Sequence, residues 1–250
     1  MIELKGVRKR FGDKVVLDGV DFTVAQGETV ALLGPSGAGK SVLLKHIIGL
    51  IHPDAGDVVV DGMSVPHLAR GELTALRQRV GYAFQMGALF DSMNVFENIR
   101  LGIPDDEHYR DRAFCSDRVL ECLRLVNLEP EVASMMPAEL SGGMRKRVGI
   151  ARAIAGSPTY LLYDEPTSGL DPVNADAMDA LIGQLQQQLN VTSVVVSHDV
   201  RGSFRVADRI ALLHDGRIRL AGPAADFLGT RDEVVRAFLD RDFQLLETGH

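Results

Sequence analysis

Residues 34–41 read GPSGAGKS, which combines three glycines with a lysine and a serine. Gly, four free positions, Gly, Lys and Ser/Thr is the pattern of a phosphate-binding loop, in which backbone N–H groups face a polyphosphate with no side chain in the way. In such a loop Lys40 reaches the β- and γ-phosphates, and the Ser41 hydroxyl ligates the magnesium ion that bridges them. A strand at 29–33 and a buried helix at 41–50 are expected on either side, as the motif requires. A flexible glycine turn is the alternative.

A second group able to act on a phosphate is a pair of carboxylates at the end of an apolar strand. Residues 160–165 read YLLYDE. A nucleotide hydrolase places an aspartate beside its magnesium ion in this way, which makes Asp164 the candidate on the metal side. Glu165 is directed differently on an extended chain and is the candidate general base for the attacking water. An apolar strand that ends in Asp-Glu usually means a turn, so this interpretation depends on the phosphate loop.

The elements that must hold these groups follow an α/β pattern. Asp61-Gly62 and Asp215-Gly216 each lie between β-rich runs and predict tight hairpins, which add antiparallel strands. From about residue 94 to 155 the pattern is helical, and Ser141 is expected to cap a helix. The other expected elements are strands at 4–7, 15–24, 159–163 and 192–196, and helices at 173–189 and from about 200.

Further motifs complete a family pattern. LSGGM at 140–144 starts a helix 23 residues before Asp164. With the phosphate loop and the Asp-Glu pair, it resembles the signature of ATP-binding cassette (ABC) ATPases. Gln85 resembles their Q-loop, Ser168 to Asp171 (SGLD) their D-loop, His198 their switch histidine, and Phe11 the aromatic residue that stacks on adenine. Taken singly, Ser141 reads as a helix cap, and Gln85 reads as a polar strand end. His198 reads as a satisfied surface or core histidine, and Phe11 reads as a core aromatic. The ordered set, from about Ile2 to Gly222, indicates the family.

The resemblance implies a P-loop NTPase cassette with a RecA-like core, an antiparallel β subdomain and a helical signature subdomain. The implied domains are an ABC ATPase domain at 1–224, with the helical subdomain inserted at about 90–155, and a tail at 225–250. ATP and Mg²⁺ are the implied cofactors. The implied catalytic residues are Glu165, His198, Gln85 and Lys40, and the metal ligands are Ser41, Gln85 and Asp164. The implied nucleotide contacts are Phe11, Gly34, Pro35, Ser36, Gly37, Ala38, Gly39, Lys40, Ser41, Val42, Ser141, Gly142, Gly143 and Asp171.

In this family two cassettes face head to tail, and the signature of one covers the ATP on the phosphate loop of the other. A helix N-terminus there supplies donors to the γ-phosphate. ATP therefore holds the pair closed, and hydrolysis to ADP and phosphate releases it. The implied partner is a second copy of the chain.

Two details resemble the Mla/Mce-type lipid-trafficking cassettes: Met144 at the fifth signature position, and the Q-loop segment QMGALFDSMNVFENI. This branch implies phospholipid trafficking between bacterial membranes, a separate membrane permease, an Mce-type substrate-binding protein and a small regulatory subunit. It places the chain peripherally at the cytoplasmic face of the inner membrane. An importer of amino acids or similar solutes and a soluble ATP-driven switch are the alternatives. The alternative for this segment is chance variation at Met144 followed by a solvated basic face at Arg145, Lys146 and Arg147.

Two apolar sets have open interpretations. The first follows Gln85 and would suit a permease helix if exposed, or belong to the core of the helical subdomain. Its members are Leu89, Phe90, Met93 and Phe96. The second forms one helical face near the end of the chain and would pack either on the same chain or on a partner subunit. Its members are Val234, Val235, Phe238 and Leu239.

The amino-acid composition argues against several classes of partner and site. With 27 basic and 34 acidic residues, the formal charge is −7, which makes nucleic acid an unlikely partner. Cys115 and Cys122 lack the paired spacing of a zinc or redox site and are expected to be reduced, structural thiols. No apolar run approaches the roughly 18 residues of a spanning helix.

Overall fold

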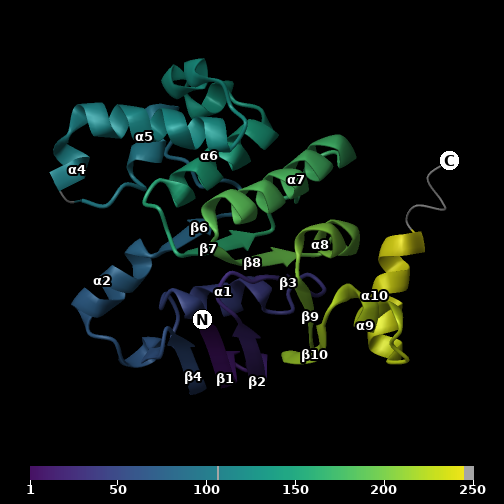
Figure 1. The fold of residues 1–250 in the computed structure, drawn as a ribbon. Coiled ribbons are helices and arrows are strands. Elements are labelled where there is room, and N and C mark those ends of the chain that lie inside the picture. Colours follow the sequence, from purple (N-terminus) through teal and green to yellow (C-terminus); the bar gives the residue numbers. More distant parts are fainter. Residues whose placement is uncertain (106, 245–250) are drawn as a thin grey trace. The chain divides into compact units, whose positions relative to one another are not determined.

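The computed structural model describes residues 1–105 and 107–244, which form two compact units (Figure 1). Unit 1 joins Met1–Leu73 to the part of the chain that starts at Thr192, and unit 2 is Thr74–Val191. Parallel and antiparallel strands occur together with helices, as the α/β pattern predicts. The predicted division into a domain at 1–224 and a tail at 225–250 stays a prediction.

Unit 1 contains an antiparallel sheet in the order β2-β1-β4-β5. Its strands are β1 (Ile2–Phe11), β2 (Lys14–Val24), β4 (Ala55–Val60) and β5 (Met63–Ser64). Alternate side chains of β1, such as Ile2 and Leu4, are buried, which gives the sheet one apolar face. The predicted hairpin is confirmed, since Val60 pairs with Met63 and the turn residues Asp61 and Gly62 both have positive φ, 50° and 79°.

The other strands of unit 1 run in the order β10-β9-β3-β8. They are β3 (Thr29–Leu33), β8 (Thr192–Ser197), β9 (Arg209–His214) and β10 (Arg217–Gly222). β3 pairs in parallel with both β8 and β9, and its five residues are all buried, which explains its continuous apolar run. The predicted second hairpin joins β9 to β10 through Asp215 and Gly216.

The last helices of unit 1 close its core. They are α8 (Val200–Val206), α9 (Ala224–Leu228) and α10 (Glu233–Gln244). In α10, Val235 and Leu239 are buried in one cluster with Leu33 of β3 and Leu212 of β9, and Phe238 packs against this cluster. Figure 1 shows α9 and α10 in yellow beside β9 and β10. The apolar face near the chain end therefore packs on the same chain, which decides between the two interpretations left open by the sequence.

Unit 2 contains a parallel pair of strands, β6 (Val80–Ala83) and β7 (Tyr160–Asp164). The helical region predicted at 94–155 is confirmed, and side chains cap its helices at Asn94, Asp111 and Ser141. Its helices are α3 (Val95–Arg100), α4 (Glu107–Arg110), α5 (Arg112–Leu125), η2 (Pro130–Ser134), η3 (Pro137–Glu139) and α6 (Gly142–Ile154), and α7 (Pro172–Leu189) follows β7.

The sequence analysis missed several short helices. α2 (Arg70–Gln78) buries only Leu76 among its residues, so its apolar periodicity is too weak to read. η1 (Val65–His67) and α9 are shorter than two helical turns. The remaining helix, α1 (Lys40–Ile47), follows β3 as predicted but ends before Leu50, because Gly49 adopts a positive φ of 62°.

Both cysteines lie on α5 with buried side chains, and no disulfide bond joins them. Burial raises the pKa of the Cys122 thiol to about 11. Across the described ranges, no helix combines the length and the apolar character that a membrane crossing requires.

Candidate functional site

The phosphate loop connects β3 to α1 in unit 1, and glycines shape its backbone. A Cβ atom on Gly34 would lie 2.4 Å from the carbonyl oxygen of Leu213, and one on Gly39 would lie 2.8 Å from Cγ1 of Val16, so neither position has room for a side chain. Gly37, with φ at 78°, faces open space. The loop therefore packs tightly at its two ends and presents bare backbone in the middle, which is the form of a cradle for an anion.

Lys40 is the buried cation of this loop. Its side chain is 5% exposed, and its Nζ donates hydrogen bonds to the carbonyl oxygens of Gly34, at 2.7 Å, and Pro35, at 3.3 Å. The ammonium group thus lies against the same loop whose backbone faces outward. Ser41 and Val42 follow in the first turn of α1 and are half-buried, whereas Ser36 is exposed and Ala38 closes a turn onto Pro35.

Unit 1 brings His198 to the same edge of its sheet as the phosphate loop. Leu33, the last residue of β3, is the register partner of Ser197, the last residue of β8. Gly34 and His198 therefore leave two neighbouring parallel strands at the same level, which is the edge where α/β sheets bind ligands. His198 is exposed, and Asp199 after it caps α8 by accepting a hydrogen bond from the Gly202 N–H at 3.0 Å.

Phe11, the predicted adenine-stacking residue, ends β1 in unit 1. Its ring is 49% exposed, and the ammonium of Lys9 lies 5.6 Å from the ring centroid. The prediction that an aromatic face is available for stacking fits this exposure, and the alternative of a core aromatic does not.

Unit 2 brings Gln85 and Glu165 to one edge of its strand pair. Ala83 and Tyr163 are register partners in β6 and β7, so Gln85 and Glu165 each lie two residues beyond the same pair. Asp164 is 8% exposed, and its Oδ2 accepts a hydrogen bond from the Tyr82 hydroxyl at 2.9 Å.

The turn after β7 has an unusual backbone. Glu165 adopts the left-handed region with φ at 54°, which costs a residue with a side chain about 1 kcal/mol or more. Its carbonyl oxygen accepts the N–H of Ser168 at 3.2 Å, and the Ser168 hydroxyl accepts a hydrogen bond from Nε2 of Gln85 at 3.3 Å. Gln85 is thus tied to the turn that carries the candidate base.

The signature residues form an open helix N-terminus. Ser141 caps α6 by accepting the Met144 N–H at 3.2 Å. Ser141 and Gly142 are exposed, and a Cβ on Gly142 would meet no atom within 4 Å. A Cβ on Gly143 would make only ordinary contacts, at 3.8 Å and beyond. The first N–H groups of a 13-residue helix are therefore accessible to an anion.

Asp171 of the D-loop lies at the start of another helix in unit 2. Its side chain caps α7 by accepting the Asn174 N–H at 3.0 Å, and it also accepts a hydrogen bond from Nδ2 of Asn174 at 2.6 Å. Hydrogen bonds from Asn174 hold the pKa of Asp171 below its usual value. The sequence analysis did not name Asn174, although the Asp-Pro pair at 171–172 is a readable helix start.

The segment after Gln85 is fastened to the signature helix by residues that the sequence analysis missed. Arg152 of α6 donates hydrogen bonds to the carbonyl oxygens of Gly87 and Ala88, both at 2.8 Å. At the other end of the segment, the buried Asn98 exchanges hydrogen bonds with the backbone of Phe90, 2.8 Å from the N–H and 3.1 Å from the oxygen. No local sequence signal connects Arg152 with Gly87 and Ala88, which precede it by 65 and 64 residues.

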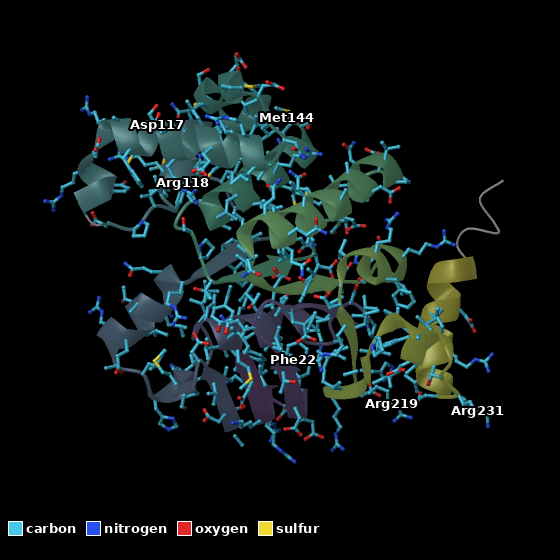
Figure 2. All side chains as sticks on the ribbon, viewed as in Figure 1. Phe22, Asp117, Arg118, Met144, Arg219 and Arg231 are labelled. Carbon is cyan, nitrogen blue, oxygen red and sulfur yellow. The ribbon has the colours of Figure 1, made fainter. Side chains whose placement is uncertain are left out.

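The alternative that residues 145–147 form a solvated basic face does not hold. Lys146 is 7% exposed and points into unit 2, and its neighbours are half-buried. Arg145 donates to the carbonyl oxygen of Leu140 at 3.0 Å, and Arg147 donates to that of Val126 at 3.3 Å. These side chains donate to backbone carbonyl groups, and β6, α3 and α5 pack against α6. Figure 2 shows Met144 on the same helix.

The apolar segment after Gln85 is exposed in part. Phe90 is 55% exposed, whereas Leu89, Met93 and Phe96 are half-buried. Met86, 76% exposed, was not among the predicted residues. Of the predicted residues, Phe90 therefore lies at the surface, and the other three are only partly accessible.

Residues 17–168 match the ABC transporter family. The chain belongs to this family. The chain is therefore an ATP-binding cassette that carries both the phosphate loop and the Asp-Glu pair. The predictions of an α/β cassette fold and of an ATPase subunit of a transporter are confirmed. Of the predicted site residues, unit 1 carries Phe11, the loop from Gly34 to Val42 and His198, and unit 2 carries Gln85, Ser141, Gly142, Gly143, Asp164, Glu165 and Asp171.

Curated relatives of the cassette belong to two named systems. The Escherichia coli K12 "Intermembrane phospholipid transport system ATP-binding protein MlaF" is 39% identical over 96% of this chain and 88% of its own length. The Haemophilus influenzae protein of the same name is 38% identical over 96% and 90%. The Mycobacterium leprae "Probable ribonucleotide transport ATP-binding protein mkl" is 40% identical over 96% of this chain and 68% of its own length.

Solved structures of other cassettes have the same fold. A dimeric post-hydrolysis state of the cassette MJ0796, bound to ADP and Pi, has a TM-score of 0.81 at 34% identity and covers 89% of this chain and 98% of its own. The cassette cbiO1 from Clostridium perfringens has a TM-score of 0.80 at 27% identity and covers 98% of both chains.

Proposed function

We propose that this cassette hydrolyses ATP to power phospholipid trafficking between bacterial membranes through a separate permease. The observation that carries the substrate is the similarity to the MlaF proteins, which extends over 96% of this chain and 88–90% of their own length. The chain covers only 68% of the relative named for ribonucleotide transport. The similarity therefore extends over a larger share of the phospholipid-transport relatives than of the ribonucleotide-transport relative.

The nucleotide contacts are assigned to unit 1. The bare backbone at Gly37 and the Lys40 ammonium match the negative charge of a polyphosphate, and the exposed ring of Phe11 matches an adenine face. The loop residues Gly34 to Val42 surround the phosphates in this assignment. Because a Cβ at Gly34 or Gly39 would collide with neighbouring atoms, the loop tolerates no bulk at these two points.

The magnesium ligands are assigned to Ser41, Gln85 and Asp164 from their side-chain chemistry. Each offers an oxygen ligand of a kind that magnesium binds, namely a hydroxyl, an amide oxygen and a carboxylate. The Tyr82 hydrogen bond orients the Asp164 carboxylate, and the Ser168 hydrogen bond takes the amide nitrogen of Gln85 and leaves its oxygen for a cation. When bound, Mg²⁺ would neutralise charge on the phosphate oxygens.

Glu165 is assigned as the general base that takes a proton from the attacking water. Asp164 already accepts a hydrogen bond from Tyr82, whereas Glu165 follows it on a turn with a left-handed backbone. His198 and Gln85 are assigned to sense and orient the γ-phosphate, and each leaves the carboxyl end of a parallel strand.

The second copy of the cassette is assigned to the open helix N-terminus at Ser141. Ser141 and Gly142 are exposed, and a Cβ on Gly142 would meet no atom within 4 Å. A surface that covers a nucleotide on another protomer must be open in this way. The solved MJ0796 cassette is dimeric. Asp171, which is also exposed, is assigned to the same contact.

The permease is assigned to unit 2. A cavity of about 650 Å³ there is lined by residues of α2, β6 and α6 and by the loop after α3, among them Tyr82, Leu101 and Arg152. Tyr82 stacks near the exposed Phe84, with ring centroids 4.4 Å apart. A short amphipathic helix of a permease would fit this apolar and polar lining. The cassette then lies peripherally at the cytoplasmic face of the inner membrane, with an Mce-type binding protein and a small regulatory subunit in the same complex.

Purification of the assembled complex in mild detergent tests this proposal. Mass spectrometry is expected to detect an integral membrane permease and bound phospholipid. Recovery of the permease with ribonucleotide or amino-acid uptake and no lipid would overturn the substrate and leave the ATPase. Recovery of the cassette with no membrane protein would overturn the transport role in favour of a soluble ATP-driven switch.

A further inference from the structure

A buried lysine contacts the turn that carries the candidate base. Lys146 lies on α6, five residues after the cap Ser141, and is 7% exposed. Its Nζ donates a hydrogen bond to the backbone carbonyl oxygen of Glu165 at 3.2 Å. Both residues belong to unit 2. The signature helix therefore contacts the Glu165 turn through a charged side chain.

This contact is the one hydrogen bond that the Lys146 ammonium makes within residues 1–105 and 107–244. An ammonium has three donors, so burying it with one acceptor is unfavourable unless a negative charge is near. Burial lowers the pKa of Lys146, and the charge of Glu165 opposes this effect. The side chain of Glu165 is thus the anion that Lys146 faces.

The carbonyl group of Glu165 receives two donors. The Ser168 N–H closes the turn from within, at 3.2 Å, and Lys146 approaches from α6 at the same distance. The left-handed conformation of Glu165, with φ at 54°, persists only where its surroundings hold it. Because this φ sets the direction in which the Glu165 side chain leaves the backbone, the two donors fix the position of the carboxylate.

Packing alone does not call for a lysine at this site. Burying a charged side chain carries a desolvation cost that an apolar side chain of similar size does not carry. Methionine matches the unbranched stem of lysine. A lysine here therefore carries a cost that a methionine would avoid, and its position against the Glu165 turn points to a role in the reaction.

We propose that Lys146 is a positioning residue that holds Glu165 in the geometry for accepting a proton from the attacking water. It links the signature helix, which begins at Ser141, to the base within one unit. This inference rests on the proposed ATPase role of Glu165.

Lys146→Met and Lys146→Arg in the assembled complex test the inference. Lys146→Met is expected to lower kcat about 10- to 100-fold, because small displacements of a catalytic group have effects of this size. Its dissociation constant for ATP is expected to stay within about twofold of the wild-type value, since the phosphate loop is untouched. Lys146→Arg keeps a charge and a donor and is expected to recover most of the rate. Arg124→Met, which removes an exposed charge from α5, is the matched control.

Hydrogen–deuterium exchange in the full chain without nucleotide supplies a readout besides activity. Lys146→Met is expected to speed exchange in the peptide that contains Ser168, whose N–H bonds to Glu165, and to leave exchange in the peptides of unit 1 unchanged. A wild-type kcat together with unchanged exchange in Lys146→Met would overturn the inference.

Glu165→Gln separates this inference from the proposed function. In that background Lys146→Met is expected to slow hydrolysis no further, because the base it positions is absent. An equal and additive loss in both backgrounds would overturn the positioning role. A fast Glu165→Gln enzyme would overturn the base assignment itself, whereas a slow Glu165→Gln enzyme beside a fast Lys146→Met enzyme overturns only the role of Lys146.

Discussion

The Tyr82 hydroxyl donates a hydrogen bond of 2.9 Å to Oδ2 of Asp164 across two parallel strands of unit 2. Burial and the nearby Asp164 charge raise the pKa of Tyr82, so the phenol stays protonated and remains a donor. The aspartate is thereby oriented as an acceptor at the end of β7. We therefore assign the proposed proton transfer to Glu165, the next residue.

Glu165→Gln keeps the shape of the side chain and removes the base. We expect ATP to bind and steady-state hydrolysis by the assembled complex to fall about 100-fold or more. Glu131→Gln, an exposed position in unit 2, is the matched control and is expected to hydrolyse ATP at the wild-type rate. Near-normal turnover by Glu165→Gln would contradict the assignment.

Mixing two inactive variants tests the composite site. Ser141→Arg blocks the open end of α6 but leaves the variant's own phosphate loop intact, whereas Lys40→Ala weakens phosphate binding and leaves the signature intact. A heterodimer of the two retains one undamaged site, and each homodimer retains none. We expect ATPase activity to reappear on mixing.

The readout for this experiment is the rate as a function of the mixing ratio, with each variant alone as the control. A maximum near equal amounts supports nucleotide binding between two copies. Mixtures as inactive as the separate variants, in complexes shown to contain both, would count against it.

The core position of α10 predicts a difference between two leucines. Leu239 is 5% exposed in the unit 1 core, whereas Leu228 at the end of α9 is 65% exposed. We expect Leu239→Ala to lower the free energy of unfolding by about 2–4 kcal/mol and Leu228→Ala to change it by less than about 0.5 kcal/mol. Urea unfolding of the full chain measures both. Equal effects would mean that α10 does not belong to the core.

His46 predicts a pH dependence of stability. It is buried in α1, its Nδ1 lies 2.7 Å from the carbonyl oxygen of Val42, and its Nε2 has no hydrogen-bond partner within the described ranges. Burial lowers the pKa of His46, so the unfolded chain binds a proton there more readily than the folded chain. The stability contributed by neutral His46 is therefore complete above the unfolded pKa of about 6.5 and is lost as the pH falls below it.

His46→Leu removes this titration and is expected to flatten the fall in unfolding free energy between about pH 7.5 and pH 5.5. The exposed His67, changed to Gln, serves as the control and is expected to change the slope less than His46→Leu does. The same slope in His46→Leu and the wild type would reject the role of His46.

Local signals in the sequence predicted much of the fold. Asp61-Gly62 and Asp215-Gly216 predicted both hairpins, because Asp-Gly suits a two-residue type I′ turn, which needs positive φ at both positions. The apolar run of β3 and the cap at Ser141 likewise depend on neighbouring residues. The apolar face near the chain end was recognised, but its partner was not, because periodicity reports an apolar face and not what covers it.

The contacts that organise the site were beyond local reasoning. Arg152 bonds to Gly87 and Ala88, and Lys146 bonds to Glu165, through long side chains that join distant parts of the chain. Consecutive charged residues on a helix indicate a solvated face by local pattern alone. Their burial depends on other elements that pack against the helix, and a local pattern does not reveal these. The family resemblance predicts roles for single residues, and the structure shows which side chains contact them.

ATP-dependent transfer of phospholipid between vesicles, with the assembled complex reconstituted, tests the central proposal most directly. We expect transfer with the wild-type cassette and ATP, and no transfer above background without ATP or with Glu165→Gln. Extracting a lipid costs about 0.8 kcal/mol for each CH₂ group exposed to water, so the process needs the energy of hydrolysis. A complex that hydrolyses ATP but moves no lipid beyond the Glu165→Gln background would contradict phospholipid trafficking as its function.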